Sequence, residues 1–140
     1  RLDTLGRAHA LTGDLPKAVS VFQKASALEP DNPAPSFHLA RTFLAQSRND
    51  EAYEILQKLV EKKQKFAPAY ELLAKLEMSR NQPTLALDVL QKLYVLDPSN
   101  IDALYLQGII YLDSNDFDNA HQIADKLAAN APGHYRASQL

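Results

Sequence analysis

The chain has 140 residues, of which 46% are hydrophobic and 23% are charged. This length fits one ordinary domain, and the apolar content is sufficient for a continuous core. A formal net charge of -2 does not favour a general binder of nucleic acid or of membrane surfaces. Because the sequence contains no cysteine, disulfides, thiolate zinc sites and a cysteine nucleophile are excluded.

No apolar run approaches the roughly 20 residues that a membrane-spanning helix needs, so we do not expect this segment to insert into a membrane. The chain begins at Arg1, inside an amphipathic stretch, without an initiator Met or a signal peptide. We therefore expect it to be a piece of a longer protein.

Apolar residues recur at helical spacing in eight segments, separated by short polar or proline-containing breaks. The first, third, fifth and seventh predicted helices cover residues 1–12, 34–46, 68–80 and 102–114. The second helices of the four pairs cover residues 16–28, 50–63, 84–96 and 118–130. Pro16 and Pro83 lie just inside second helices, where the missing N–H costs nothing. Part of a ninth helix is expected to begin at His134.

Positions 34 residues apart carry similar side chains along the chain, without any insertion. The small columns are Gly6/Ala40/Ala74/Gly108 and Ala18/Ala52/Ala86/Ala120. The bulkier columns are Phe22/Leu56/Leu90 and Leu59/Leu93/Leu127. Two columns are interrupted, one of leucines (Leu5, Leu39, Leu73) by Gln107, and one of prolines (Pro30, Pro98, Pro132) by Gln64. We expect the small columns where paired helices cross, because a larger side chain would push the axes beyond 8–10 Å.

The segment LGRAHALTGDLPKAVSVFQKASALEP resembles the tetratricopeptide repeat (TPR) family. The resemblance covers a single domain over residues 1–140, with repeats at approximately 1–32, 33–66, 67–100 and 101–134 and a partial fifth repeat at 135–140. It implies an all-α fold in which antiparallel helix pairs stack into a right-handed α-α superhelix, or solenoid. Gln64 departs from the closing proline, which predicts a looser junction at the third repeat. The sequence is also loosely similar to repeat regions of bacterial cell-envelope proteins of polysaccharide export and exosortase systems.

In this family the first helix of each repeat lines a concave groove that holds a protein or peptide. By column, the resemblance implies a partner-binding groove formed by Arg7, Phe37, Arg41, Leu44, Glu71, Lys75, Met78, Tyr105, Ile109 and Leu112. Neighbouring groove positions are Asp3, Ala10, Leu11, Ala34, Ala45, Ser79, Asp102 and Asp113, with Arg136 continuing the wall. A subclass that captures chaperone C-termini has Lys and Asn at set groove columns, and the absence of Asn from those columns here argues against that partner.

Two features of this groove suggest what it binds. Arg7, Arg41 and Lys75 share one column and would form a basic ladder suited to an acidic peptide. The alternative is that Asp3–Arg7 and Glu71–Lys75 are ordinary i, i+4 surface pairs, whereas Arg41 can instead form a cation–π contact with Phe37. The second feature is an apolar wall formed by Phe37, Leu44, Met78, Tyr105, Ile109 and Leu112, unless some of these pack under the next first helix.

Nothing in the sequence forms a catalytic or metal-binding constellation. No two of the four histidines share an i, i+4 helical face, which excludes a helical zinc pair. The four glycines are isolated, and DSNDFD at 113–118 lacks the glycine and glutamate of a calcium loop. Glu77, on a packing column, is expected to reach solvent or pair with a cation. We predict no catalytic residue, no metal and no cofactor, and therefore no enzyme.

The favoured function is a protein–protein interaction scaffold that binds a peptide or protein segment in the groove. The alternative is a structural subunit that self-associates through uncapped repeat ends, or that organises a bacterial envelope complex for polysaccharide or protein export. No nucleic-acid partner is expected. The composition is compatible with the bacterial cytoplasm and with the periplasm or cell envelope.

Overall fold

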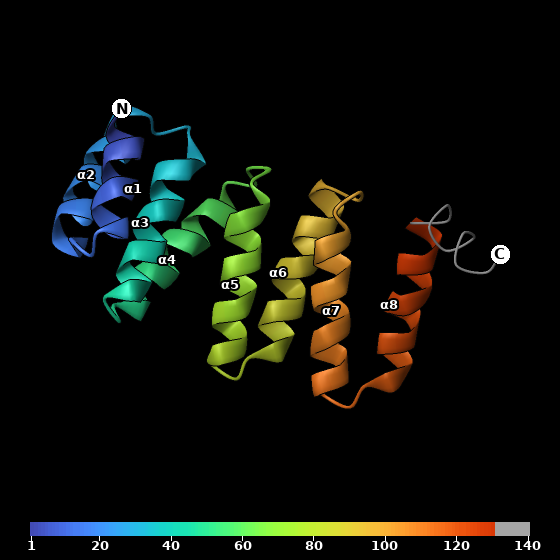
Figure 1. Cartoon of the computed structure of the whole chain (residues 1–140). Coiled ribbons are helices and arrows are strands. Elements are labelled where there is room, and N and C mark those ends of the chain that lie inside the picture. Colours follow the sequence, from blue (N-terminus) through green and yellow to red (C-terminus); the bar gives the residue numbers. More distant parts are fainter. Residues whose placement is uncertain (131–140) are drawn as a thin grey trace. The chain divides into compact units, whose positions relative to one another are not determined.

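The computed structural model describes residues 1–130, which form eight α-helices and no strand (Figure 1). The helices are α1 Leu2–Leu11, α2 Leu15–Leu28, α3 Pro33–Ala45, α4 Asn49–Glu61, α5 Ala67–Ser79, α6 Pro83–Leu96, α7 Ile101–Asp113 and α8 Phe117–Asn130. Each end lies within two residues of the predicted one. The expectations for Pro132, His134 and Arg136 lie outside the described residues. No helix within residues 1–130 combines the length and apolarity needed to cross a bilayer.

The turn inside each helix pair has the same backbone geometry, repeated at the 34-residue step. One residue per turn has a positive φ: Gly13 (85°), Ser47 (61°), Asn81 (60°) and Asn115 (57°). The next residue's N–H then donates back to a carbonyl of the preceding helix, as from Arg48 to Phe43 at 2.8 Å and from Gln82 to Glu77 at 2.9 Å. This is the left-handed helix ending that satisfies otherwise unpaired carbonyls, and it reverses the chain tightly enough to pair the helices.

Helix starts are fixed by side-chain caps and prolines. Asn32 and Asn100 accept hydrogen bonds from the backbone at the starts of α3 and α7, and Asp14 does so for α2. Pro16 and Pro83 lie in the first turns of α2 and α6, as predicted. These local signals explain why the helix bounds could be deduced from sequence.

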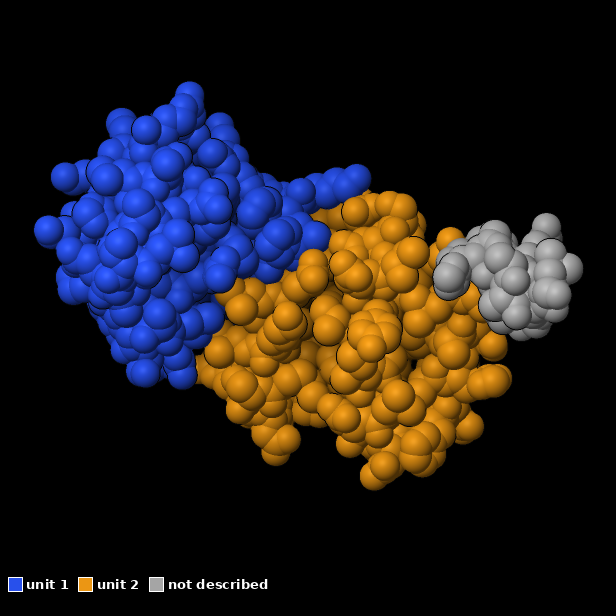
Figure 2. Space-filling model, in the orientation of Figure 1, with its two compact units in different colours: residues 1–69 blue, residues 70–140 orange. Residues whose placement is uncertain are grey.

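The chain divides into two compact units, residues 1–69 and residues 70–140 (Figure 2). In the first unit, α1 packs on α2, α2 on α3 and α3 on α4. In the second unit, α6 packs on α7 and α7 on α8. Each helix that bridges two neighbours is therefore shared between successive pairs, as a helical repeat requires.

The small columns lie where paired helices cross, as expected from the sequence. Ala18, Ala40, Ala52 and Ala86 are completely buried. A Cβ atom added at Gly6 would lie 2.6 Å from the Phe22 ring, and one added at Gly108 would lie 3.3 Å from Ile123. Phe22, Leu56 and Leu90 of the bulky column are also buried, so the repeat pattern defines the core.

Three departures from the repeat have distinct outcomes. Glu77 is only 4% exposed, so of the two arrangements expected for it, reaching solvent or pairing with a cation, the first is wrong. Gln107 is buried in the leucine column, and its amide donates to the Gln91 side chain at 3.4 Å. At Gln64, where proline is absent, the chain leaves α4 after Glu61 through Lys63, which has a φ of 56°. The Gln64 side-chain amide donates a hydrogen bond to the Asp31 carbonyl at 3.3 Å.

Candidate functional site

A hollow of about 430 Å³ lies between the first helices of the first unit, α1 and α3, and we call it the α1–α3 hollow. The ring of Phe22, from α2, contributes to it from beneath Gly6, where the absence of a side chain leaves room for the ring. Its lining is Arg7, Ala10, Leu11, Leu15, Phe22, His38, Arg41, Thr42 and Ala45. The hollow therefore combines an apolar base with cationic side chains.

Arg7 and Arg41 both line this hollow and are both exposed. Neither forms an ion pair or hydrogen bond with any residue between 1 and 130. The i, i+4 pair of Asp3 with Arg7 is not formed; Asp3 Oδ1 instead lies 3.7 Å from His38 Nε2. Two rungs of the predicted basic ladder thus converge on one hollow, with their guanidinium donors uncompensated by this part of the chain.

Arg48, on the turn before α4, is an arginine of the same unit whose guanidinium group is paired with a carboxylate. Its guanidinium donates to both carboxylate oxygens of Glu51, at 2.7 and 2.6 Å, and lies 4.4 Å from the Phe43 ring centroid. A bidentate pair of this kind satisfies the planar fork of an arginine. The unpaired arginines of the hollow therefore differ from a structural arginine on the same unit.

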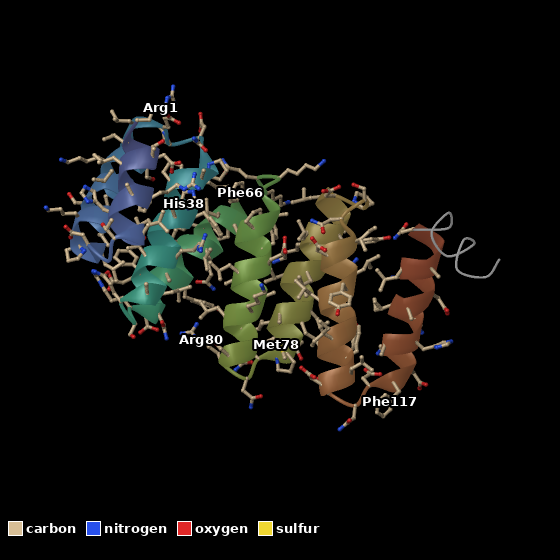
Figure 3. The ribbon with its side chains drawn as sticks, viewed as in Figure 1. Arg1, His38, Phe66, Met78, Arg80 and Phe117 are labelled. Atoms are coloured by element: carbon tan, nitrogen blue, oxygen red, sulfur yellow. The ribbon has the colours of Figure 1, made fainter. Side chains whose placement is uncertain are left out.

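Phe37 lies next to the hollow, and its ring contacts the Arg41 guanidinium group. The Arg41 guanidinium carbon is 5.9 Å from the Phe37 ring centroid, so the predicted cation–π contact is formed, near the outer limit for such contacts. Phe66, just before α5, meets the same ring edge-on at 5.4 Å. Figure 3 labels Phe66 and His38 in this region. Phe37 is half-buried by these contacts and is not a freely exposed groove residue.

His38 joins the base of the hollow to its charged rim. Its ring stacks on Phe22 at 5.5 Å and meets Phe37 at 5.7 Å. Burial lowers the pKa of His38 most; Asp3 opposes this, and the positive charges of Arg7 and Arg41 lower the pKa further. At neutral pH the imidazole is therefore neutral, and the cationic character of the hollow comes from the two arginines.

The remaining predicted groove residues lie on α3, α5 and α7. Leu44 is half-buried. In the second unit, Lys75, Met78 and Ile109 line a hollow of about 210 Å³ between α5 and α7. Tyr105 is 60% exposed, Ile109 37% and Leu112 53%. The last three are thus not packed away under a neighbouring helix.

Glu71 is the acidic member of this second group. It is half-buried at the first-helix face of α5, and the predicted i, i+4 ion pair with Lys75 is not formed. Desolvation raises the pKa of Glu71 most; the nearby Asp102 carboxylate raises it further, and Lys75 partly offsets this. The third member of the predicted basic ladder is Lys75, which shares a repeat column with Arg7 and Arg41. It lines a different hollow, in the second unit.

Sequence reasoning missed His38 and Thr42 as parts of the site. His38 occupies a repeat column that holds leucine at positions 72 and 106. A polar ring in this largely apolar column is the one sequence feature that could have identified His38 as a site residue. Thr42 is buried, and its hydroxyl donates to the His38 carbonyl at 2.8 Å, a contact that composition does not reveal. Within the described chain, no group of three His, Asp or Glu side chains is placed to hold a metal ion. The arrangement offers recognition by charge and shape.

Solved structures with similar folds include repeat proteins. MamA 41–end from Desulfovibrio magneticus RS-1 is 26% identical, with a TM-score of 0.72 over 99% of this chain and 75% of its own. TTC0263, a thermophilic TPR protein of Thermus thermophilus, is 21% identical with a TM-score of 0.67, covering 94% and 73%. YrrB, described as a TPR protein with an unusual peptide-binding site, is 18% identical with a TM-score of 0.69, covering 95% and 69%. The last two show likeness of fold alone.

Sequence comparison agrees with these structures. No relative was found among the curated proteins. Two profiles of the tetratricopeptide repeat match, one over residues 10–76 and one over residues 71–135. Together with the repeated helix pairs and the 34-residue columns, these matches show that the chain is an all-α helical-repeat solenoid that belongs to the tetratricopeptide repeat family.

Proposed function

We propose that this interaction scaffold binds an extended, acidic segment of a partner protein along the first helices α1 and α3 of its first unit, with a carboxylate held in the α1–α3 hollow. The observation that carries the proposal is that Arg7 and Arg41 converge on one hollow without an ion pair among residues 1–130. A carboxylate placed between them would accept charge-assisted hydrogen bonds, which are about twice as strong as neutral ones.

The apolar base of the hollow adds a second requirement. Phe22 is 1% exposed, and Leu11 is 88% exposed, so an apolar partner side chain beside the carboxylate would cover Leu11 without displacing the ring beneath. Burying such apolar surface contributes roughly 25 cal/mol per Å². The proposed ligand is therefore an Asp, Glu or terminal carboxylate flanked by an apolar side chain.

The test begins with peptides selected from a random library displayed on phage. The affinity of an enriched acidic peptide is then measured by fluorescence anisotropy for the wild type and for Arg7→Gln with Arg41→Gln. Loss of two charge-assisted contacts is expected to weaken binding by about tenfold or more. Binding should also weaken with added salt, because the contact is ionic.

A matched control replaces Lys24 and Lys58 by Gln. These exposed lysines lie on the second helices α2 and α4 of the same unit, so the net charge changes equally. The control variant should bind like the wild type. Equal loss in both variants would show a diffuse charge effect, and a selection without acidic peptides would contradict the proposal.

A second candidate function, self-association, is supported by exposed apolar residues on both units. Leu5 and Leu11 of α1 are 46% and 88% exposed, and Phe117 of α8 is 62% exposed. Light scattering over a range of concentrations tests it. A mass that rises with concentration and falls on Phe117→Ser supports self-association, and a constant monomer mass contradicts it.

A further inference from the structure

We propose that the second unit carries a recognition site of opposite charge, which binds a Lys or Arg side chain of a partner segment next to an apolar anchor. The site, here called the α5–α7 face, consists of Glu71 and Met78 on α5 and of Asp102, Tyr105 and Ile109 on α7. It rests on the proposed function in that a partner segment lies along the first helices.

The two carboxylates of the α5–α7 face have no hydrogen-bond or ion-pair partner among the described residues. Glu71 and Asp102 form no hydrogen bond or ion pair with any described side chain or backbone group. They are close enough for Asp102 to raise the pKa of Glu71, which burial has already raised. Lys75 on the same helix lowers it only in part. A partner's cation would relieve this repulsion and favour the ionised form of Glu71.

An apolar surface lies beside the carboxylates. Tyr105 is one helical turn from Asp102, and 60% of it is exposed. Ile109 and Met78 line the hollow of about 210 Å³ between α5 and α7, which is wide enough for one aliphatic side chain. Figure 3 labels Met78 on α5. The Tyr105 ring can also accept the face of a guanidinium group.

Charge complementarity selects the occupant. On the described helices α5 and α7 the only cation of Lys or Arg type is Lys75, against the carboxylates of Glu71, Asp102 and Asp113 and the buried Glu77. An acidic segment would be repelled here, although it suits the α1–α3 hollow of the first unit. A segment with Lys or Arg beside Leu or a similar anchor matches both the carboxylates and the exposed apolar residues.

The experiment selects a random phage-displayed peptide library against the wild-type chain and against Glu71→Gln with Asp102→Asn. Enriched peptides are sequenced in both pools. The wild-type pool is expected to contain Lys or Arg next to an apolar residue, and the variant pool should lose this class. One such peptide, measured by fluorescence anisotropy, should bind the variant about tenfold more weakly than the wild type.

Reversing the charges of both the peptide and the chain provides a stronger test. The same peptide with its Lys changed to Glu should bind the Glu71→Lys variant better than the wild type. Asp118→Asn with Asp125→Asn, on the second helix α8, is the matched control and should leave binding unchanged. Circular dichroism verifies that all variants remain helical.

Two results would overturn the inference. One is an equal frequency of Lys and Arg in the peptides selected on the wild type and on the Glu71→Gln, Asp102→Asn variant. The other is enrichment of uncharged apolar peptides alone. Failure of the proposed function is distinguishable, because it appears as acidic peptides that do not respond to Arg7→Gln with Arg41→Gln. Binding of basic peptides that is unaffected by either double variant would place their site elsewhere and would also overturn the inference.

Discussion

At the scale of single residues, one column of the repeat holds two glycines in different surroundings. The Cβ that alanine would add at Gly6 lies 2.6 Å from the ring of Phe22, which is 1% exposed. At Gly108 the nearest atom, Cγ2 of Ile123, is 3.3 Å away. The first distance is a clash with a buried ring, whereas the second requires only a small shift. The same column therefore has a strict size limit in one repeat and a relaxed one in another.

Gly6→Ala is expected to lower the free energy of unfolding by about 1–3 kcal/mol, the range typical of overpacking. Gly108→Ala should change it by less than about 1 kcal/mol, because the helical preference of alanine offsets the tighter contact. Urea unfolding of both variants measures the difference. Equal effects would show that the Phe22 ring is free to move.

His38 gives the first unit a pH dependence. Burial holds its native pKa below the ordinary value of about 6.5, so the unfolded chain takes up the proton at higher pH than the native chain does. The contribution of His38 to stability is therefore fully present above that pH and is lost as pH falls through the lower native pKa. Unfolding free energies across this window should fall less steeply in His38→Gln than in the wild type. Parallel curves would show that another group is responsible.

At the scale of elements, α6 and α7 meet through a polar pair where other repeats use leucine. Gln107 is 5% exposed, and its hydrogen bond to Gln91 is long at 3.4 Å. The equivalent residues Leu39 and Leu73 are buried apolar side chains. The α6–α7 contact therefore contains a weakly satisfied amide in an otherwise apolar column.

Gln107→Leu should raise the free energy of unfolding by about 1 kcal/mol, because a poorly bonded amide is replaced by an apolar group of similar size. Gln91 is exposed and can bond to water instead. Leu73→Gln, the reverse change in the same column, should cost about 2 kcal/mol or more. Chemical denaturation provides both values; a loss of stability on Gln107→Leu would show that the amide pair has a specific structural role.

Helices and core could be predicted from the sequence because their causes are local or periodic. The 34-residue columns identified Ala18, Ala52 and Ala86 as crossing points, and all three are buried. The site could be predicted only in part. The column of Arg7 and Arg41 was visible, but the position of the Asp3 carboxylate, 3.7 Å from His38 and not paired with Arg7, depends on how α1 and α3 pack. The burial of Glu77 was not the favoured expectation, because it depends on how α5 packs against its neighbours.

At the scale of the whole molecule, one repeated backbone presents different chemistry in its two units. The α1–α3 hollow has two unpaired arginines over an apolar base. The α5–α7 face has two carboxylates beside exposed Tyr105 and Ile109. Fold determines which positions face a partner, and the residues at those positions determine what is recognised. Both proposed contacts belong to first helices, and this shared placement is the central claim.

The most direct measurement is the change in backbone amide chemical shifts of the isotope-labelled chain when a selected acidic peptide is added. We expect the largest shifts on α1 and α3, at Arg7, Ala10, Arg41 and Ala45, with little change on α2 and α4. The largest shifts on α2 and α4, with α1 and α3 unaffected, would contradict binding along the first helices.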